Sequence, residues 1–172
     1  LQTISGLGSL STVKRFLEYW ENTFMLFYVK KYDFSLKKQI LNSRKVYAID
    51  TGLIRQIGFH FSDDRGHLLE NQIFNSLQRR NFDIYYHREK RECDFLIGDK
   101  GKVIKAIQVT VSLYNPSTRE RELLGLKEAM LCYGLSTGYI ITETEEEILT
   151  ENGWTINIIS AWKWLLEEEI QI

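Results

Sequence analysis

The chain has 172 residues, of which 44% are hydrophobic and 13% aromatic, so it can bury the core of one domain of ordinary size, or of a domain with a small appendage. Lys and Arg number 22 and Asp and Glu 23, so the net charge is −1 and any nucleic-acid surface has to be a local patch. Two cysteines exclude a disulfide framework, and no apolar run has transmembrane length. Because there is neither an initiator Met nor a signal-peptide pattern, we expect a fragment of a longer cytoplasmic protein.

Residues 1–49 predict a helix followed by a basic two-stranded hairpin. Ser11 and Thr12 can cap a helix whose apolar side chains recur at helical spacing, namely Val13, Phe16, Leu17, Trp20 and Phe24. Apolar runs over 25–29 and 46–49 predict strands, and the segment between them is turn-like and basic. A helix with such a hairpin is the back half of a winged helix. Because this partial winged-helix segment is too small to be stable alone, we expect it to dock on residues 50–172 or on sequence before residue 1.

Residues 50–172 predict an α/β domain with a mixed sheet flanked by helices. The predicted elements are a short helix over 51–57, a loop over 59–65, a helix over 66–80, strands over 83–87, 93–97 and 102–113, a helix over 118–134, a strand over 137–142, an acidic turn over 143–147, a strand over 154–159 and a helix over 161–166. The sequence at 98–101, Gly-Asp-Lys-Gly, predicts a hairpin turn. Asn115-Pro116 predicts a break in the chain.

Four polar residues are spaced as in the site of a metal-dependent nuclease. Glu70 lies on a predicted helix, Asp94 opens an apolar strand, and Gln108 and Thr110 form a polar-x-polar pair on the next strand. Acids that converge from separate elements can bind Mg²⁺, which prefers carboxylate oxygens and lowers the pKa of a bound water. Asp94 and Gln108 are 14 residues apart with a turn between them, so a bulged or offset hairpin would make them cross-strand neighbours.

The segments around these residues, 66–71, 92–97 and 107–110, resemble the PD-(D/E)xK restriction-endonuclease-like superfamily. More narrowly, nearly the whole chain resembles the C-terminal region of a family of bacterial and archaeal AAA+ ATPases, a region classed as domain of unknown function 4143. Residues 45–53 and 118–122 are similar to two further motifs of that region. The resemblance implies a restriction-endonuclease-like fold over residues 50–172 and an ATPase domain as the N-terminal partner.

The resemblance also implies site residues. Glu70 and Asp94 take the place of metal ligands, Gln108 that of the second acid and Thr110 that of the lysine, so Glu70, Asp94 and Gln108 would hold Mg²⁺. Gln108 offers an amide oxygen but no charge, and Thr110 cannot replace an ammonium group. We therefore expect a nuclease fold in which Gln108 and Thr110 disfavour cleavage.

A lysine could have moved to another position of the fold. The candidates are Lys102, Lys105 and Lys127. Lys105 should face away from Gln108, and Lys102 lies about 20 Å from it along the strand. Neither Lys102 nor Lys105 is a convincing substitute for the missing ammonium group.

Three functions stay open: nucleic-acid binding without catalysis, Mg²⁺-dependent nuclease activity, and binding of a protein partner. The candidate phosphate contacts are Lys37, Lys38, Arg44, Lys45, Arg119 and Arg121. Charged segments of this kind are more often simply solvated. Trp162 and Trp164 belong either to a partner surface or to the core. Because no Gly-rich loop ends in Gly-Lys-Ser/Thr, we expect no ATP site of that type in this chain.

Overall fold

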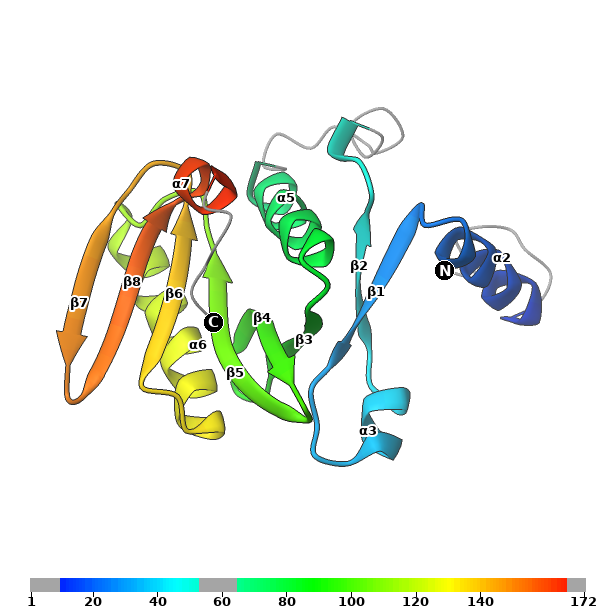
Figure 1. Cartoon of the computed structure of the whole chain (residues 1–172), viewed down its shortest axis with the longest axis horizontal. Coiled ribbons are helices and arrows are strands. Elements are labelled where there is room, and N and C mark those ends of the chain that lie inside the picture. Colours follow the sequence, from blue (N-terminus) through cyan, green and yellow to red (C-terminus); the bar gives the residue numbers. More distant parts are fainter. Residues whose placement is uncertain (1–9, 53–64, 167–172) are drawn as a thin grey trace.

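The structure is a computed structural model that describes residues 10–52 and 65–166. Its strands are β1 (Leu26–Lys31), β2 (Arg44–Ala48), β3 (Asp83–Arg88), β4 (Glu92–Asp99), β5 (Lys102–Val109), β6 (Thr137–Thr142), β7 (Glu147–Glu151) and β8 (Trp154–Ser160). Its helices are α2 (Leu10–Asn22), α3 (Leu36–Leu41), α5 (Arg65–Arg79), α6 (Pro116–Tyr133) and α7 (Ala161–Leu166). In these described residues the strands form one mixed sheet in the order β2-β1-β3-β4-β5-β6-β8-β7 (Figure 1), which confirms the predicted α/β class.

Each face of the sheet carries its own hydrophobic core. On one face, Phe74 and Leu77 of α5 and Trp164 of α7 pack against strand residues such as Phe95. On the other face, α6 packs its side chains, Leu126 among them, against the strands. The central strands are therefore covered on both sides, as their nearly continuous apolar sequences require. Among the described residues, no helix is long and apolar enough to cross a membrane.

The hairpin of β1 and β2 forms one end of this same sheet. β1 pairs with β2 in antiparallel fashion and with β3 in parallel fashion, so the sheet continues across the boundary that the sequence predicts between residues 49 and 50. The segment over 1–49 and the domain over 50–172 thus share a sheet in the structure. Their division into two units stays a prediction about independent folding.

Two local predictions for the N-terminal part are wrong. The segment between β1 and β2 is not simply turn-like, because it contains α3, a stretch without Gly or Pro in which Leu, Lys and Gln favour a helix. Ser11 and Thr12 do not precede the first helix, because α2 already begins at Leu10. The predicted helix over 51–57 and loop over 59–65 fall mostly outside the described residues.

The elements from α5 onward follow the predicted order, with one strand more. β6 and α7 have the predicted bounds, whereas β5 ends at Val109 and α6 begins at Pro116. Asn115-Pro116 is thus a helix start as well as a break, since the Asn115 side chain accepts a hydrogen bond from the Ser117 N–H. The unpredicted strand is β7, which follows the acidic turn and pairs with β8. Its sequence signal is Asn152-Gly153, whose φ values of 51° and 82° suit a two-residue hairpin turn.

Helix α6 approaches β4 closely at Gly125. A methyl group on Gly125 would collide with the carbonyl oxygen of Glu92, the first residue of β4. Because backbone atoms cannot swing aside as a side chain can, only glycine permits this approach. Gly125 therefore sets how near α6 lies to the strand that begins with Glu92, Cys93 and Asp94.

We predict that Gly125→Ala destabilises the fold by about 1–3 kcal/mol, because the added methyl overpacks the contact between α6 and β4. Gly66→Ala is the matched control: Gly66 also lies in a helix, and a methyl there meets no atom within 4 Å. The control should be neutral or slightly stabilising. Urea unfolding of the two variants measures the difference, and equal stability of Gly125→Ala and wild type would contradict the prediction.

Candidate functional site

A polar cavity of about 1020 Å³ lies where α5, β4, β5 and the first turns of α6 meet. Its lining includes Glu70, Asp94, Gln108 and Thr110. The four residues that the sequence predicts as catalytic positions thus surround one cavity. Glu70 lies on a helix and Asp94 and Gln108 on strands, as predicted, namely on α5, β4 and β5. Thr110 follows directly after β5.

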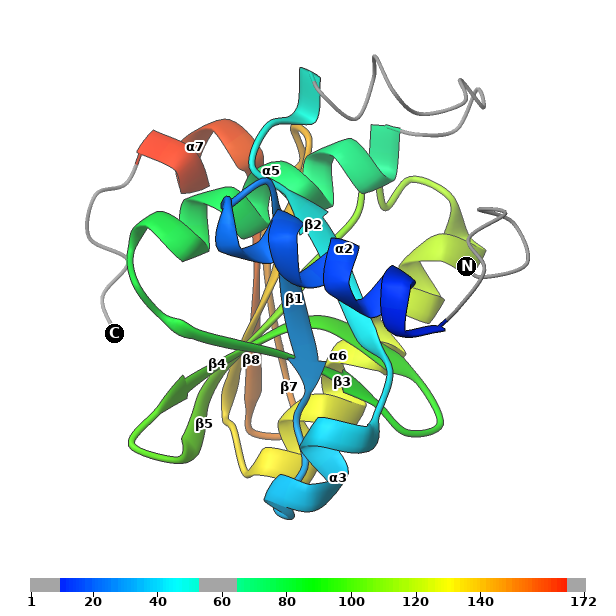
Figure 2. The same ribbon diagram turned by 90° about the vertical axis from the view of Figure 1, so that its right-hand side faces the viewer.

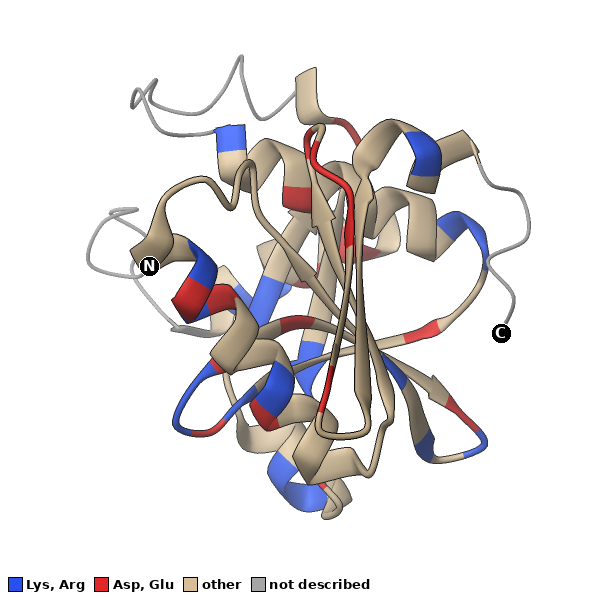
Figure 3. Ribbon diagram, turned by 90° about the vertical axis from the view of Figure 1, so that its left-hand side faces the viewer, with Lys and Arg blue, Asp and Glu red and all other residues tan. Residues whose placement is uncertain are grey.

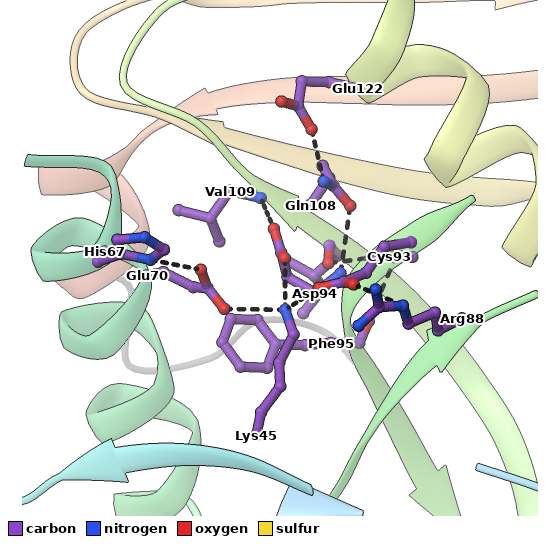
Figure 4. Close-up of polar contacts among 12 residues, drawn as sticks. Lys45, His67, Glu70, Arg88, Cys93, Asp94, Phe95, Gln108, Val109 and Glu122 are labelled. Atoms are coloured by element: carbon purple, nitrogen blue, oxygen red, sulfur yellow. Dashed lines mark hydrogen bonds and ion pairs between the residues drawn. The ribbon is translucent and has the colours of Figure 1, made fainter. Parts of the chain in front are cut away.

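Lys45 of β2 lies at the centre of the acidic residues (Figure 4). Its Nζ is 3.0 Å from Glu70 Oε1, 2.8 Å from Asp94 Oδ1 and 2.7 Å from Glu92 Oε1. Burial alone lowers the pKa of Lys45, but the carboxylates of Asp94 and Glu70 outweigh burial and raise the pKa above its ordinary value. The side chain is therefore an ammonium ion at neutral pH, bound by three acids.

This position differs from the predicted role of Lys45 as a phosphate contact on an exposed hairpin. Only 19% of the side chain is exposed, and its charge is engaged by carboxylates. Thr110 has no ammonium group, and Lys45 supplies one to the site from another strand. The three lysines considered from the sequence do not line the cavity: Lys127 pairs with Glu151 at 2.7 Å, Lys105 lies over the ring of Tyr139, and Lys102 begins β5 at its exposed end.

Tyr47 is a second β2 residue that reaches the site. Its hydroxyl donates a hydrogen bond of 2.6 Å to Glu70 Oε1, and its ring stacks on Phe74 of α5 at 4.3 Å between centroids. Burial and the charge of Glu70 raise the pKa of the Tyr47 phenol, which keeps the hydroxyl as a donor. Lys45 and Tyr47 are two residues apart on a strand and so face the same side. That spacing was the sequence signal for their joint role.

Asp94 lies at a bulge that turns its side chain toward Lys45. β3 and β4 pair as Tyr85 with Leu96 and as His87 with Cys93, so Asp94 and Phe95 together oppose a single residue, Tyr86. A bulge of this kind re-aims side chains beside functional sites. The Asp94 carboxylate accepts a hydrogen bond from the Val109 N–H at 3.0 Å. Burial raises the pKa of Asp94 to about 6, against the opposing effect of Lys45.

Gln108 connects Asp94 to an acid that the sequence did not assign to the site. Its Oε1 accepts a hydrogen bond from the Asp94 N–H at 3.2 Å, and its Nε2 donates one of 2.5 Å to Glu122 Oε2 (Figure 4). Glu122 is buried on α6 and also pairs with Arg121. An acid at position 108 would meet the Glu122 carboxylate as a like charge, whereas the amide donates to it. The signal for Glu122 was its helical spacing from the apolar Leu126 and Ala129.

The arrangement does not fit a divalent cation. The Lys45 ammonium lies where a cation bridging Glu70 and Asp94 would lie, and the Gln108 oxygen accepts a backbone hydrogen bond. Within residues 10–52 and 65–166, no group of three or more His, Cys, Asp or Glu side chains is placed to hold a metal ion. The site instead satisfies its acids with protein donors.

Three basic residues line the cavity, and the sequence predicted only Arg121 among them. Lys90 and Arg91 lie on the turn between β3 and β4, and Arg121 lies on α6. Glu128 of α6 fixes that turn, because its Oε1 accepts hydrogen bonds of 3.1 Å from the N–H groups of both Lys90 and Arg91. The buried His87 contacts the same oxygen at 3.1 Å.

The other predicted phosphate contacts lie elsewhere. Lys37 and Lys38 of α3 and Arg44 of β2 are exposed and do not line the cavity, and Arg119 pairs with Glu147 at 2.6 Å. Lys and Arg alternate with Asp and Glu over the ribbon in Figure 3, as the net charge of −1 suggests. Three basic residues, Lys90, Arg91 and Arg121, thus border the cavity beside acids that have protein partners.

Fold and site together define the class of this protein: an α/β domain whose mixed sheet carries a cavity of paired acidic and basic side chains. A family described as Domain of unknown function (DUF4143) matches residues 65–163, which is more than half of the chain, and the chain belongs to this family.

The chain is similar to two proteins that are described as uncharacterized. A protein of Methanocaldococcus jannaschii is 31% identical over 169 residues, which cover 92% of this chain, and a protein of Haemophilus influenzae is 27% identical over 157 residues, which cover 91%. The chain spans about 37% of the length of each of these relatives. No solved structure matches the chain.

We predict that Lys45→Met raises the pKa of Asp94 from about 6 by about 1 or more, because the variant removes the nearest opposite charge. Since an acid whose pKa is raised in the folded state loses stability as the pH rises from its unfolded pKa to its folded pKa, the variant should be less stable at pH 7 than at pH 5. Carboxyl ¹³C NMR titration and urea unfolding at the two pH values measure both effects.

Lys127→Met is the control for this titration, because it removes an ammonium group that pairs with Glu151 away from the cavity. It should leave the Asp94 titration unchanged. An Asp94 titration that is the same in Lys45→Met as in wild type would contradict the assignment of Lys45 as the counter-ion.

Proposed function

We propose that this chain is a nuclease-like module of a longer protein that binds nucleic acid at the rim of its cavity and does not cut it. The observation that carries the proposal is the position of the Lys45 ammonium, within 3.0 Å of both Glu70 and Asp94. An ammonium ion there balances the acids that a nuclease uses for metal ions, so the site is electrostatically satisfied without Mg²⁺.

A restriction-endonuclease-like ancestry of the PD-(D/E)xK type is the part of the proposal that explains why these residues meet. Glu70 from a helix, Asp94 from a strand and the pair Gln108 and Thr110 at the end of the next strand all border one cavity. The share of the relatives that the chain spans, about 37%, supports a module of a longer protein. We propose that an AAA+ ATPase domain forms part of the remainder, on the resemblance of residues 45–53 and 118–122.

Nucleic acid is the ligand that the rim suits best. Lys90, Arg91 and Arg121 line the cavity from opposite sides, and guanidinium groups pair well with phosphate oxygens. The acids beneath them are held by Lys45 and Gln108, so a phosphate at the rim meets less uncompensated negative charge. With a net charge of −1, such binding depends on the local patch and should be steeply salt-dependent.

We predict that the longer protein binds short duplexes or single strands at low salt and that Lys90→Ala with Arg91→Ala weakens this binding. Each lost phosphate contact should reduce the slope of log affinity against log salt by about 1. The control is Lys100→Ala with Lys102→Ala, which changes the charge equally but lies on the hairpin of β4 and β5, outside the cavity lining. Fluorescence anisotropy measures both pairs. Absence of binding at low salt, or equal losses in the two pairs, would argue for a protein partner instead.

We also predict that the longer protein leaves plasmid DNA intact in the presence of Mg²⁺ or Mn²⁺. The physical reason is that Lys45 occupies the place between Glu70 and Asp94. Gel electrophoresis after prolonged incubation is the measurement, with Asp94→Ala as the control for contaminating nuclease. Cleavage by the wild type that disappears in Asp94→Ala would show an active metal-dependent nuclease and would refute the non-cutting part of the proposal.

A further inference from the structure

Helices α2 and α3 and strands β1 and β2 face the viewer in Figure 2. This part of the chain is rich in exposed hydrophobic side chains. Sixteen large hydrophobic side chains are exposed in the described residues, and 11 of them belong to residues 16–49. These 11, which we call the N-terminal apolar face, are Phe16, Tyr19, Trp20, Phe24, Met25, Phe34, Leu36, Ile40, Leu41, Val46 and Ile49. Single exposed hydrophobic residues are ordinary, but a concentration of this kind marks a contact surface.

Helix α2 is covered on one side only. Val13 is buried, and the Tyr28 hydroxyl of β1 donates a hydrogen bond to the Leu17 carbonyl oxygen, so this side packs on the sheet. Phe16 and Trp20, one helical turn apart, are 41% and 45% exposed. A helix of 13 residues gains little stability from its own hydrogen bonds, and most helical stability comes from packing of the apolar face. The flank of α2 that carries Phe16 and Trp20 therefore lacks the cover that its sequence suits.

Strand β2 adds an open edge to the same side. It is the last strand of the sheet and pairs with β1, so the N–H and C=O groups on its other edge have no strand partner in the described sheet. Val46, in the middle of β2, is 54% exposed. Proteins normally cover or charge such an edge, because an apolar one invites pairing with another chain.

We infer that a further segment of the longer polypeptide packs on the N-terminal apolar face. Most of the length of both relatives lies outside the part that matches this chain, so such a segment has ample chain to come from. Permanent interfaces are more hydrophobic than transient ones. This face holds 11 of the 16 exposed large hydrophobic side chains of the described residues, among exposed charged side chains such as Lys14, Glu18 and Lys37. A tethered segment also has a high effective concentration at the face. The inference rests on the longer-protein part of the proposed function and is independent of nucleic-acid binding.

Hydroxyl-radical footprinting of the longer protein, read by mass spectrometry, tests this inference. Trp20 should be labelled about ten-fold less than Trp162, because an interface residue loses nearly all of its exposed area. Trp162 is the internal control, since it is 54% exposed on α7 and lies outside the face. Tyr19 should be protected in the same way relative to Tyr114, which is also exposed.

A dilution series distinguishes packing of a tethered segment from packing of a second copy of the chain. Protection of Trp20 that persists at every protein concentration supports the inference. Protection that disappears on dilution assigns the face to self-association and overturns it, and so does labelling of Trp20 equal to that of Trp162. In Trp20→Asp, increased labelling of Tyr19 and Phe24 is expected, whereas Trp162→Asp should leave both unchanged. Neither readout involves nucleic acid, so failure here is distinguishable from failure of the binding proposal.

Discussion

The ion pairs of Lys45 are the interaction on which the rest of the site depends. Glu70, Glu92 and Asp94 all direct an oxygen to one ammonium group, at distances of 2.7 to 3.0 Å. Carboxylates gathered in a partly buried place would repel one another, and each would be costly to desolvate without a counter-ion. One lysine thus lets three acids share the cavity. It also joins the end of the sheet at β2 to helix α5 and to central strand β4.

The charges of the site are matched in pairs across the fold. Position 110 holds threonine, and the ammonium group comes from Lys45 on another strand. Position 108 holds glutamine, and the buried carboxylate comes from Glu122 on α6. The ammonium group and the buried carboxylate of the site therefore come from β2 and α6 and not from positions 110 and 108. The site thus stays polar while its acids are already paired with protein donors.

The two ends of the sheet differ in how they are covered. Helices α5, α6 and α7 enclose two hydrophobic cores, one of which extends to Val29 of β1 and Tyr47 of β2. At β1 and β2, a short helix and an open strand leave aromatic and aliphatic side chains exposed. Lys45 of β2 contacts three acids that line the cavity, Glu70, Glu92 and Asp94. The N-terminal apolar face and the counter-ion of the site thus share strand β2, since Val46 belongs to the face and Lys45 to the site.

The resemblance to a nuclease pattern implied that Glu70, Asp94, Gln108 and Thr110 would lie together, and all four border one cavity. The sequence by itself also determined the α/β class and the order of most elements. These follow from local periodicity and turn residues, which neighbouring positions encode. Only the tertiary structure decided the roles of Lys45 and Glu122. Lys45 is 49 residues from Asp94, and Glu122 is 14 residues from Gln108. The sequence shows the sign of each side-chain charge but not which residue it pairs with. The pairing depends on which strands are neighbours and how near α6 packs to β4.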